Sequence, residues 1–415
     1  MTHPADLSAT EALRLIAAGQ LTAPALWEAC QDRIAMREPA VRAFTTRASS
    51  MPATVEGPLG GLPVGVKDVL DTSDLASEYG SPIWAGHQPR ADAFAVTRTR
   101  AAGGRVIGKT VTTEFATRRA GPTANPHDVK RTPGGSSSGS AAGVAAGFFP
   151  LAFGTQTAGS VLRPAAYCGI AGFKPSHGLI HRAGMKVMAE SLDTIGVFGR
   201  GAADCALFAG VLTNQDLSAV AETAPRVALC FGPAEDRLTP ETRALLDGTA
   251  ARLSAAGARV TTLALPEAVL AVNEAHPTVM HGETLQSLAW ERVHHRDRIS
   301  AVLNERLDWA EAMTAATLAG GRATFASGRA AFLDFMADYD ILLTASAPGE
   351  APEGLESTGE PVCNALWTAL HGPCISLDAA RGPAGMPLGI QLVAPFGQDA
   401  ALLGWARWVE KVIAR

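Results

Sequence analysis

Small residues dominate one stretch of the chain, residues 133–175, and they restrict its possible folds more than any other feature. The stretch opens with PGGSSSGS, runs through an alanine- and glycine-rich segment at residues 140–149, and continues with GTQTAGSVLRP at residues 154–164. A flexible Gly/Ser linker would lie at a domain break. Apolar segments with helix and strand patterns flank this stretch instead, so we expect it inside a folded core.

Helical and strand patterns alternate around this stretch, which predicts an α/β architecture. Ser8 and Glu11 form a capping box that starts a first helix, and a second helix follows. Further helices are predicted at residues 94–102, 140–149 and 400–413, and strands at residues 62–69, 105–108, 151–153, 227–230, 259–265, 339–345 and 388–393. Between residues 214 and 338 charges become frequent and helical periodicity dominates, as at residues 283–302 and 308–336.

Composition narrows the class of protein. Hydrophobic residues make up 47% of the 415 residues and charged residues 18%, which excludes a disordered chain. The net charge of −5 excludes a nucleic-acid binder that works by bulk positive charge. Residues 1–20 lack the pattern of a secretory signal, no apolar stretch is long enough to cross a bilayer, and the six cysteines form no CxxC pair. We therefore expect a cytoplasmic protein with buried, reduced thiols.

A P-loop pattern at residues 103–110, GGRVIGKT, makes nucleotide binding a first interpretation. That mechanism needs a strand before the glycines and a helix after them, so that the helix N-terminus faces phosphate. Here the predicted helix precedes the glycines and the predicted strand follows them. The pattern therefore favours a tight helix-to-strand turn.

A second pattern, GSSSG at residues 135–139, fits the G-x-S-x-G turn that carries the serine of α/β-hydrolases. That turn needs a strand running directly into it, whereas residues 126–132 are polar and begin with a proline. A Ser-His-Asp hydrolase would also need a late histidine, for which His371 is the candidate. We expect a loop before these serines rather than a strand.

Three separated pieces together indicate a different chemistry. Lys67 lies inside the apolar run GVKD, Ser136 in PGGSSSGS and Ser160 in GTQTAGSVLRP. A lone serine is usually a cap or a turn residue, and a lone buried lysine usually extends its amine towards solvent. All three together in glycine-rich apolar settings are rare by chance.

On these pieces the chain resembles the amidase signature family, hydrolases with a Ser–cis-Ser–Lys triad. Further matching motifs cover most of the chain: GLPVGVKD (61–68), TANP (123–126), PAAYCGIAGFKP (164–175), SLDTIG (191–196), YDILLT (339–344) and GMPLGIQLV (385–393). The resemblance implies one α/β/α layered domain, residues 1–415, in which helices cover a large mixed β-sheet. Its expected parts are N-terminal helices (1–60), the signature core (61–200), a variable helical region that sets substrate preference (214–338) and a C-terminal completion of the core (339–415).

The resemblance assigns Ser160 as the nucleophile, Ser136 as a bridging serine that relays the proton, and Lys67 as the base. A serine hydroxyl attacks only when a neighbouring base takes its proton, and a lysine can do so only when it is neutral. Burial in an apolar setting lowers the pKa of a lysine towards that state. The family holds the bridging serine through a cis peptide bond, here expected between Gly135 and Ser136. The oxyanion donors are assigned to the backbone of Thr157, Ala158, Gly159 and Ser160.

Two positions depart from the family pattern. Gln156 stands where the family carries Asp, and the arginine expected two residues after the nucleophile is Leu162, with Arg163 next to it. This form is similar to that of compact, malonamidase-like members, in which the shifted arginine binds a substrate carboxylate. Arg163 is therefore expected either to bind an acidic or carbonyl-bearing group or to pair with a buried acid such as Asp193.

The resulting hypothesis is hydrolysis of small linear amides through an acyl-serine intermediate, with no cofactor and no metal. The same residues could cleave a carbamate, an aryl amide or an ester. A different class is the A-type subunit of a glutamine-dependent amidotransferase, whose members keep the Asp and Arg that are altered here. Gly135 and Ser137 complete the candidate substrate contacts. The expected partner is a small-molecule amide, with no nucleic acid and no membrane, and the malonamidase-like form implies a homodimer.

Overall fold

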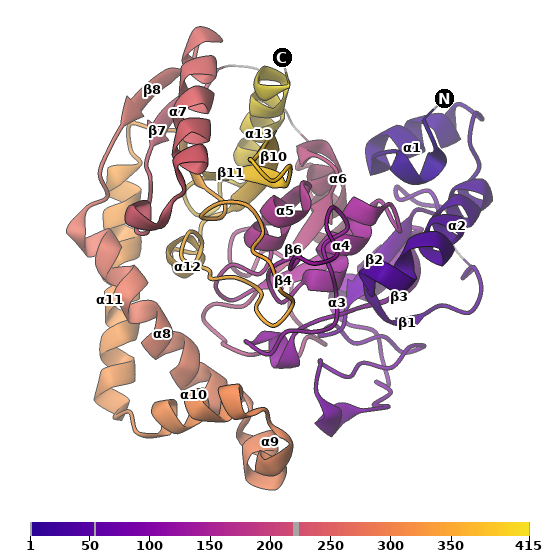
Figure 1. Ribbon diagram of the computed structural model, residues 1–415, viewed down its shortest axis with the longest axis horizontal. Coiled ribbons are helices and arrows are strands. Elements are labelled where there is room, and N and C mark those ends of the chain that lie inside the picture. Colours follow the sequence, from indigo (N-terminus) through magenta and orange to yellow (C-terminus); the bar gives the residue numbers. More distant parts are fainter. Residues whose placement is uncertain (1, 54, 219–223, 415) are drawn as a thin grey trace.

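One continuous sheet runs through the computed structural model, which describes residues 2–53, 55–218 and 224–414 (Figure 1). Within these residues the sheet has eleven strands: β1 (Phe44–Arg47), β2 (Pro63–Lys67), β3 (Arg105–Thr110), β4 (Leu151–Gln156), β5 (Ala171–Lys174), β6 (Thr194–Gly199), β7 (Arg226–Leu229), β8 (Arg259–Thr262), β9 (Ile341–Ala345), β10 (Cys374–Arg381) and β11 (Pro387–Val393). Their order across the sheet is β1-β3-β2-β4-β6-β5-β10-β11-β9-β7-β8. Some neighbours are parallel, such as β2 and β4, and others antiparallel, such as β4 and β6. The predicted α/β fold with a large mixed sheet is confirmed.

Thirteen α-helices surround the sheet in the described part of the chain. They are α1 (Ala9–Ala17), α2 (Ala23–Val41), α3 (Phe94–Ala101), α4 (Ser138–Ala146), α5 (Leu162–Cys168), α6 (Ala202–Thr213), α7 (Pro240–Ala255), α8 (Glu267–Ser287), α9 (Ala289–His294), α10 (Ala301–Glu311), α11 (Ala315–Phe335), α12 (Ala365–Ala369) and α13 (Asp399–Ile413). Short 3-10 helices include η2 (Pro82–Trp84) and η3 (Glu114–Ala116). None of the helices among these residues combines the length and apolarity that a membrane span requires.

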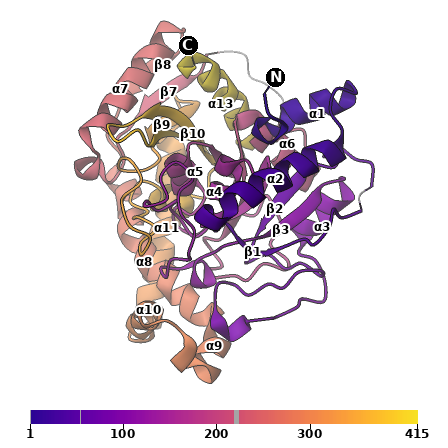
Figure 2. The same ribbon diagram turned by 45° about the vertical axis from the view of Figure 1, so that its right-hand side comes forward.

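Helices cover both faces of the central strands. On β4, the ring of Phe153 packs against Phe208 of α6, with ring centroids 4.8 Å apart. The next residue, Gly154, faces the other side, because successive residues of a strand point to opposite faces. A Cβ at Gly154 would come within 3.0 Å of Val161, just before α5. In Figure 2, α4 and α5 lie in front of the sheet, so the sheet is the middle of three layers.

The turn between α3 and β3 confirms the interpretation of the P-loop pattern. Gly103 adopts a positive φ of 83° between helix and strand, so the glycines follow a helix and precede a strand. Lys109, which would have contacted phosphate, is fully buried and forms an ion pair with Asp68 at 3.2 Å. All six cysteines are buried and free, as predicted.

The capping box at the start of α1 is half formed. Ser8 Oγ accepts a hydrogen bond from the backbone N–H of Glu11 at 3.1 Å, as predicted. The Glu11 carboxylate pairs with Arg14 at 2.7 Å instead of reaching back to the cap.

Between residues 214 and 338 the helices begin and end at other residues than those that the periodicity predicts. Residues 283–302 and 308–336 were expected as two helices, whereas α8 to α11 divide this part of the chain. One break has a tertiary cause, because the N–H and hydroxyl of Ser300, just before α10, both donate to the carboxylate of Glu114 in the core. Figure 1 shows α8, α10 and α11, coloured salmon to orange, along one side of the molecule, opposite α1 and α2.

Candidate active site

The three residues predicted as a triad lie together at the carboxyl ends of two neighbouring strands. β2 and β4 are parallel, and Lys67 is the last residue of β2. Ser160 follows β4 in the turn that leads into α5, and Ser136 lies in the loop before α4. The sheet therefore fixes the lysine, while two tight loops bring the serines to it.

A series of hydrogen bonds connects these groups. Lys67 Nζ donates to Ser136 Oγ at 2.7 Å and to Thr155 Oγ1 at 2.6 Å. The backbone N–H of Ser136 donates to Ser160 Oγ at 3.1 Å. Lys67 is fully buried, whereas Ser160 is partly exposed and lines a cavity. Ser136 thus contacts the amine through its hydroxyl and Ser160 through its backbone N–H, while the proton relay through that hydroxyl stays a prediction.

The environment of Lys67 favours the neutral amine. Burial lowers its pKa to about 7, and the negative charge of Asp193 opposes this shift. The described residues offer Lys67 no ion pair, in contrast to the Lys109–Asp68 pair. Asp193 instead accepts hydrogen bonds from Thr157 Oγ1 at 2.5 Å and from two backbone N–H groups. A lysine in such a setting can act as a base near neutral pH.

The turn predicted to bind the oxyanion has its carbonyl groups already occupied. The Thr157 carbonyl accepts from His276 Nε2 at 3.0 Å, the Ala158 carbonyl from Thr368 Oγ1 at 2.7 Å, and the Gly159 carbonyl from the N–H of Arg163 at 3.0 Å. Among the described residues, no hydrogen bond is donated by the N–H groups of Ala158, Gly159 or Ser160. These donors therefore remain available beside the cavity.

Gln156, one of the two departures from the family pattern, holds this turn in place. Its Oε1 accepts from the backbone N–H groups of Val161 and Leu162 at 2.8 and 3.1 Å, where α5 begins. Its Nε2 donates to Thr368 Oγ1 at 2.9 Å. A neutral amide thus accepts hydrogen bonds from buried N–H groups at the helix N-terminus, a role that a carboxylate could also have filled.

The expected cis peptide bond is not found. The bond between Gly135 and Ser136 is not cis, and no cis bond occurs among the described residues. The chain turns there instead through two consecutive glycines with positive φ, +82° at Gly134 and +62° at Gly135. A Cβ on Gly135 would lie 3.2 Å from the Cα of Ser160, so glycine permits both the backbone conformation and the close approach.

The two further candidates for substrate contact do not line the cavity. Ser137 is fully buried, and its Oγ donates to the Thr155 carbonyl and accepts from the Thr155 N–H, both at 3.2 Å. Contact of Gly135 or Ser137 with substrate stays a prediction. His371 is not available to an α/β-hydrolase triad either, because its ring stacks on His177 at 4.2 Å and its Nε2 lies 2.7 Å from both Arg329 Nη2 and the Ser191 carbonyl oxygen.

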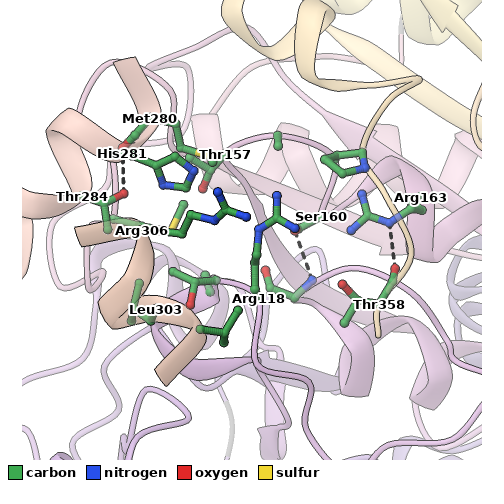
Figure 3. A pocket seen from close by; sticks show the side chains of 18 of the residues that line it. Arg118, Thr157, Ser160, Arg163, Met280, His281, Thr284, Leu303, Arg306 and Thr358 are labelled. Atoms are coloured by element: carbon green, nitrogen blue, oxygen red, sulfur yellow. Dashed lines mark hydrogen bonds between the residues drawn. The ribbon is translucent and has the colours of Figure 1, made fainter. Parts of the chain in front are cut away.

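The cavity next to Ser160 is rich in arginine (Figure 3). Arg163 lies on one side of Ser160 in this view and Arg306 on the other, with the guanidinium of Arg118 between Arg306 and Ser160. Arg163 is 3% exposed, and its Nε donates to the Thr358 carbonyl at 2.9 Å, whereas Nη1 has no hydrogen-bond partner within the described residues. Among the described residues it forms no ion pair with Asp193, and substrate binding by Arg163 stays a prediction.

Several residues of this site are not predicted from the sequence. Thr155 could have been predicted, because it belongs to the GTQT motif that precedes Ser160. Arg118, His281 and Arg306 carry no local signal, because they come from a loop, α8 and α10, which only the fold brings together.

Known proteins resemble this chain over most of its length. A profile described as Amidase matches residues 26–403. The A-type subunit of the glutamyl-tRNA(Gln) amidotransferase from Symbiobacterium thermophilum is 38% identical over an alignment of 321 residues, gaps included, that covers 68% of this chain and 65% of that protein. The corresponding protein from Deinococcus radiodurans is 30% identical over 435 residues, with 90% of each chain covered.

The matched share of each relative differs. Further A-type amidotransferase subunits are matched over only 48% of their own length, so the chain spans about half of those proteins. One solved structure, described as the crystal structure of amidase, has a TM-score of 0.89 at 26% identity and covers 98% of this chain and 100% of that one. The family match and the shared fold extend across the site as well as the scaffold around it. The chain therefore belongs to the Amidase family of amidase signature proteins.

Proposed function

We propose that this chain hydrolyses amides through an acyl-serine intermediate. Ser160 attacks the carbonyl carbon while Ser136 accepts its proton and passes its own to neutral Lys67. The protonated lysine then returns a proton through Ser136 to the leaving nitrogen, and the C–N bond breaks. Water attacks the resulting ester in the same way and releases the acid. The observation that carries this proposal is the 2.7 Å hydrogen bond between a buried lysine with a pKa of about 7 and the serine that neighbours Ser160.

We assign the oxyanion of the tetrahedral intermediate to the backbone N–H groups of Thr157, Ala158, Gly159 and Ser160. The carbonyls of this turn are fixed by His276 and Thr368, which supports a preorganised row of donors. A Cβ at Gly159 would come within 2.7 Å of Arg163 Nη1, which supports the need for a glycine at this turn.

The substrate that we propose is a small linear amide with a carboxylate bound by Arg163. The unpaired Nη1 of this buried guanidinium supports an anionic ligand, because buried charged groups are normally paired. A carbamate, an aryl amide or an ester would react through the same groups. In this proposal residues 1–415 form one catalytic domain, which works as a homodimer, and the helical region 214–338 sets the substrate preference.

Substitutions at Ser160 test this function directly. Ser160→Ala is expected to reduce amidase activity by at least about a thousandfold, since the nucleophile is lost. A fluorophosphonate probe should label the native protein at Ser160 and leave this variant unlabelled. Ser254→Ala, which changes an exposed serine on α7, is the matched control and should keep full activity. Full activity of Ser160→Ala would overturn the proposal.

A second candidate function comes from the relatives, which are named as subunits of an amidotransferase. In that case the chain would release ammonia from an amide for transfer to glutamyl-tRNA(Gln) with the help of other subunits. Gln156 and Leu162 support independent hydrolysis instead, because the amidotransferase branch keeps Asp and Arg at these positions. Amide hydrolysis by the purified chain alone supports the first function. Activity that appears only with added partner subunits and charged tRNA supports the second.

A further inference from the structure

We propose that Arg118 and Arg306 bind a second anionic group of the substrate, on the opposite side of Ser160 from Arg163. The substrate would then be an amide with a carboxylate on each side of its scissile bond. This inference rests on the proposed function, because it names the substrate class of the same site.

The first observation concerns Arg306. It projects from α10 into the cavity, and its Nε is buried without a hydrogen-bond partner within the described residues. A buried guanidinium N–H that lacks an acceptor carries the full cost of its desolvation. An anion bound in the cavity would supply the missing acceptor.

The second observation is that Arg118 joins Arg306 from a different part of the chain. Arg118 comes from the exposed loop after η3, and in Figure 3 its guanidinium points towards that of Arg306. Both charges act on one neighbour: the pKa of His281 is lowered to about 4 by burial and by Arg306 and Arg118. Two arginines from separate elements therefore direct positive charge into the same space.

The third observation is the lack of compensating charge. The described residues that line the cavity include Arg118, Arg163 and Arg306 but no aspartate or glutamate. Neither Arg118 nor Arg306 forms an ion pair with any described residue. His281 is neutral at physiological pH because of its low pKa, so it adds no charge of its own. The excess positive charge is best neutralised by the ligand.

The positions of the arginines define the shape of the ligand. Arg163 and Arg306 lie on opposite sides of Ser160 in Figure 3, with the guanidinium of Arg118 between Arg306 and Ser160, so an amide centred on Ser160 reaches both sides with its two ends. Met188, Met280 and Leu303 line the cavity as well and suit the carbon chains between the amide and its charged ends. Bidentate contacts of guanidinium with carboxylate would fix both ends.

A set of four amides separates the two anion sites. N-succinylglycine carries a carboxylate on the acyl and on the amine side. N-butyrylglycine and N-ethylsuccinamate each replace one carboxylate by a methyl group, and N-ethylbutyramide replaces both. We expect the highest kcat/KM for N-succinylglycine, and a loss of about tenfold or more for each carboxylate removed, because hydrogen bonds to charged groups are the stronger kind.

Three variants assign each carboxylate to its arginine. Arg306→Leu and Arg118→Leu should remove the preference for one of the two carboxylates and leave the preference for the other. Arg163→Leu should remove the preference for the second carboxylate and leave the preference for the first. Arg119→Leu is the matched control, because this exposed neighbour of Arg118 does not line the cavity. A uniform fall in kcat/KM across all four amides for Arg118→Leu and Arg306→Leu would overturn the inference.

Binding to an inactive variant distinguishes this inference from the proposed function. The affinity of Ser160→Ala for N-succinylglycine, measured by calorimetry, should fall about tenfold or more when Arg306→Leu is added. Binding without turnover in the native protein would contradict the proposed function and leave the second anion site supported. Turnover without any effect of Arg118→Leu or Arg306→Leu would contradict the second anion site alone.

Discussion

At the scale of single residues, the proposed chemistry depends on the pKa of the Lys67 amine, which burial lowers and the charge of a nearby carboxylate raises. Burial lowers the pKa of Lys67 to about 7, and Asp193 limits that shift through its charge. Asp193 does not touch the amine, because it is held by Thr157 Oγ1 and two backbone N–H groups. The carboxylate thus tunes the proton affinity of the base from a distance.

The pH dependence of activity follows from this arrangement. Protonated Lys67 cannot accept a proton, so kcat/KM is expected to rise with pH through about 7 and to level off above it. In Asp193→Asn the acid limb should move to lower pH, because the charge that raises the pKa of Lys67 is gone. Steady-state rates between pH 5 and 9 check both points. An acid optimum in the native protein would contradict a neutral-lysine base.

Thr155 is a positioning residue for Lys67, since its hydroxyl accepts from Nζ at 2.6 Å. Thr155→Val keeps the shape of the side chain and removes this acceptor, so kcat should fall about ten- to a hundredfold with little change in KM. Thr155→Ser retains the hydroxyl and should recover most of the activity. Equal losses in both variants would indicate a packing role instead.

At the scale of elements, the start of α5 is fixed by a side chain of the preceding strand. Gln156 accepts from the first backbone N–H groups at the start of α5 and also contacts Thr368, which holds the Ala158 carbonyl. Ser160, the proposed nucleophile, and the proposed oxyanion donors lie between these two anchoring points. Stability and activity are therefore coupled at this turn.

Gln156→Ala tests that coupling. The variant leaves two N–H groups uncapped, so the free energy of unfolding should fall by about 1–2 kcal/mol, and kcat should fall as the turn loosens. Denaturant unfolding measures the first effect. Gln286→Ala, at an exposed position of α8, is the matched control and should change neither quantity. A variant with lowered stability and native kcat would show that the turn keeps its shape without the cap.

The start of α10 depends on the core in a comparable way. The buried carboxylate of Glu114 accepts from the N–H and the hydroxyl of Ser300, and α10 carries Arg306 into the cavity. Glu114→Ala should raise KM several-fold with a smaller change in kcat, because the chemistry around Ser160 is untouched. Glu305→Ala, on the exposed side of α10, should leave KM unchanged. A loss confined to kcat would contradict this role of α10.

The sequence predicts those elements whose pattern is local. β2, β3, β4 and α13 appear near their expected residues, since each carries a short apolar run or an amphipathic pattern. The strand β5 was missed because its four residues, AGFK, include a single large apolar side chain, and β6 because two of its six residues, TIGVFG, are glycines. The ends of α10 were missed because Glu114, far away in the sequence, determines them.

The same distinction applies to the site. Lys67, Ser136 and Ser160 lie in recognisable motifs, and the fold brings them together as expected. The backbone at Gly135 was predicted as cis and is not, because two glycines with positive φ already provide the turn. Arg118 and Arg306 depend on a loop and a helix that pack together from distant parts of the chain, which no local pattern encodes.

At the scale of the whole molecule, the sheet joins segments that are far apart in the sequence. β10 and β11 lie between β5 and β9, so the C-terminal strands connect the signature core to β9, β7 and β8. Removal of residues 339–415 would expose the edges of β5 and β7 and delete the helix that carries Thr368. A chain that ends at residue 338 is therefore expected to be insoluble or unfolded by circular dichroism.

The complete protein should unfold as one unit for the same reason. Tryptophan fluorescence, circular dichroism and residual activity are expected to decline at the same denaturant concentration, because no part of the sheet can separate without leaving open edges. Two resolved transitions would instead indicate that the helical region, residues 214–338, folds independently.

The position of β10 and β11 in the interior of the sheet also affects how the chain folds during its synthesis. A ribosome adds roughly 5–20 residues per second, so roughly 10–40 seconds pass between the emergence of β5 and that of its neighbour β10. During that time the growing chain holds a half-built sheet with an open apolar edge, and the turn around Ser160 lacks its contact with Thr368. We therefore expect nascent chains to need protection of that edge, and the turn around Ser160 to reach its final form only after residue 368 has emerged.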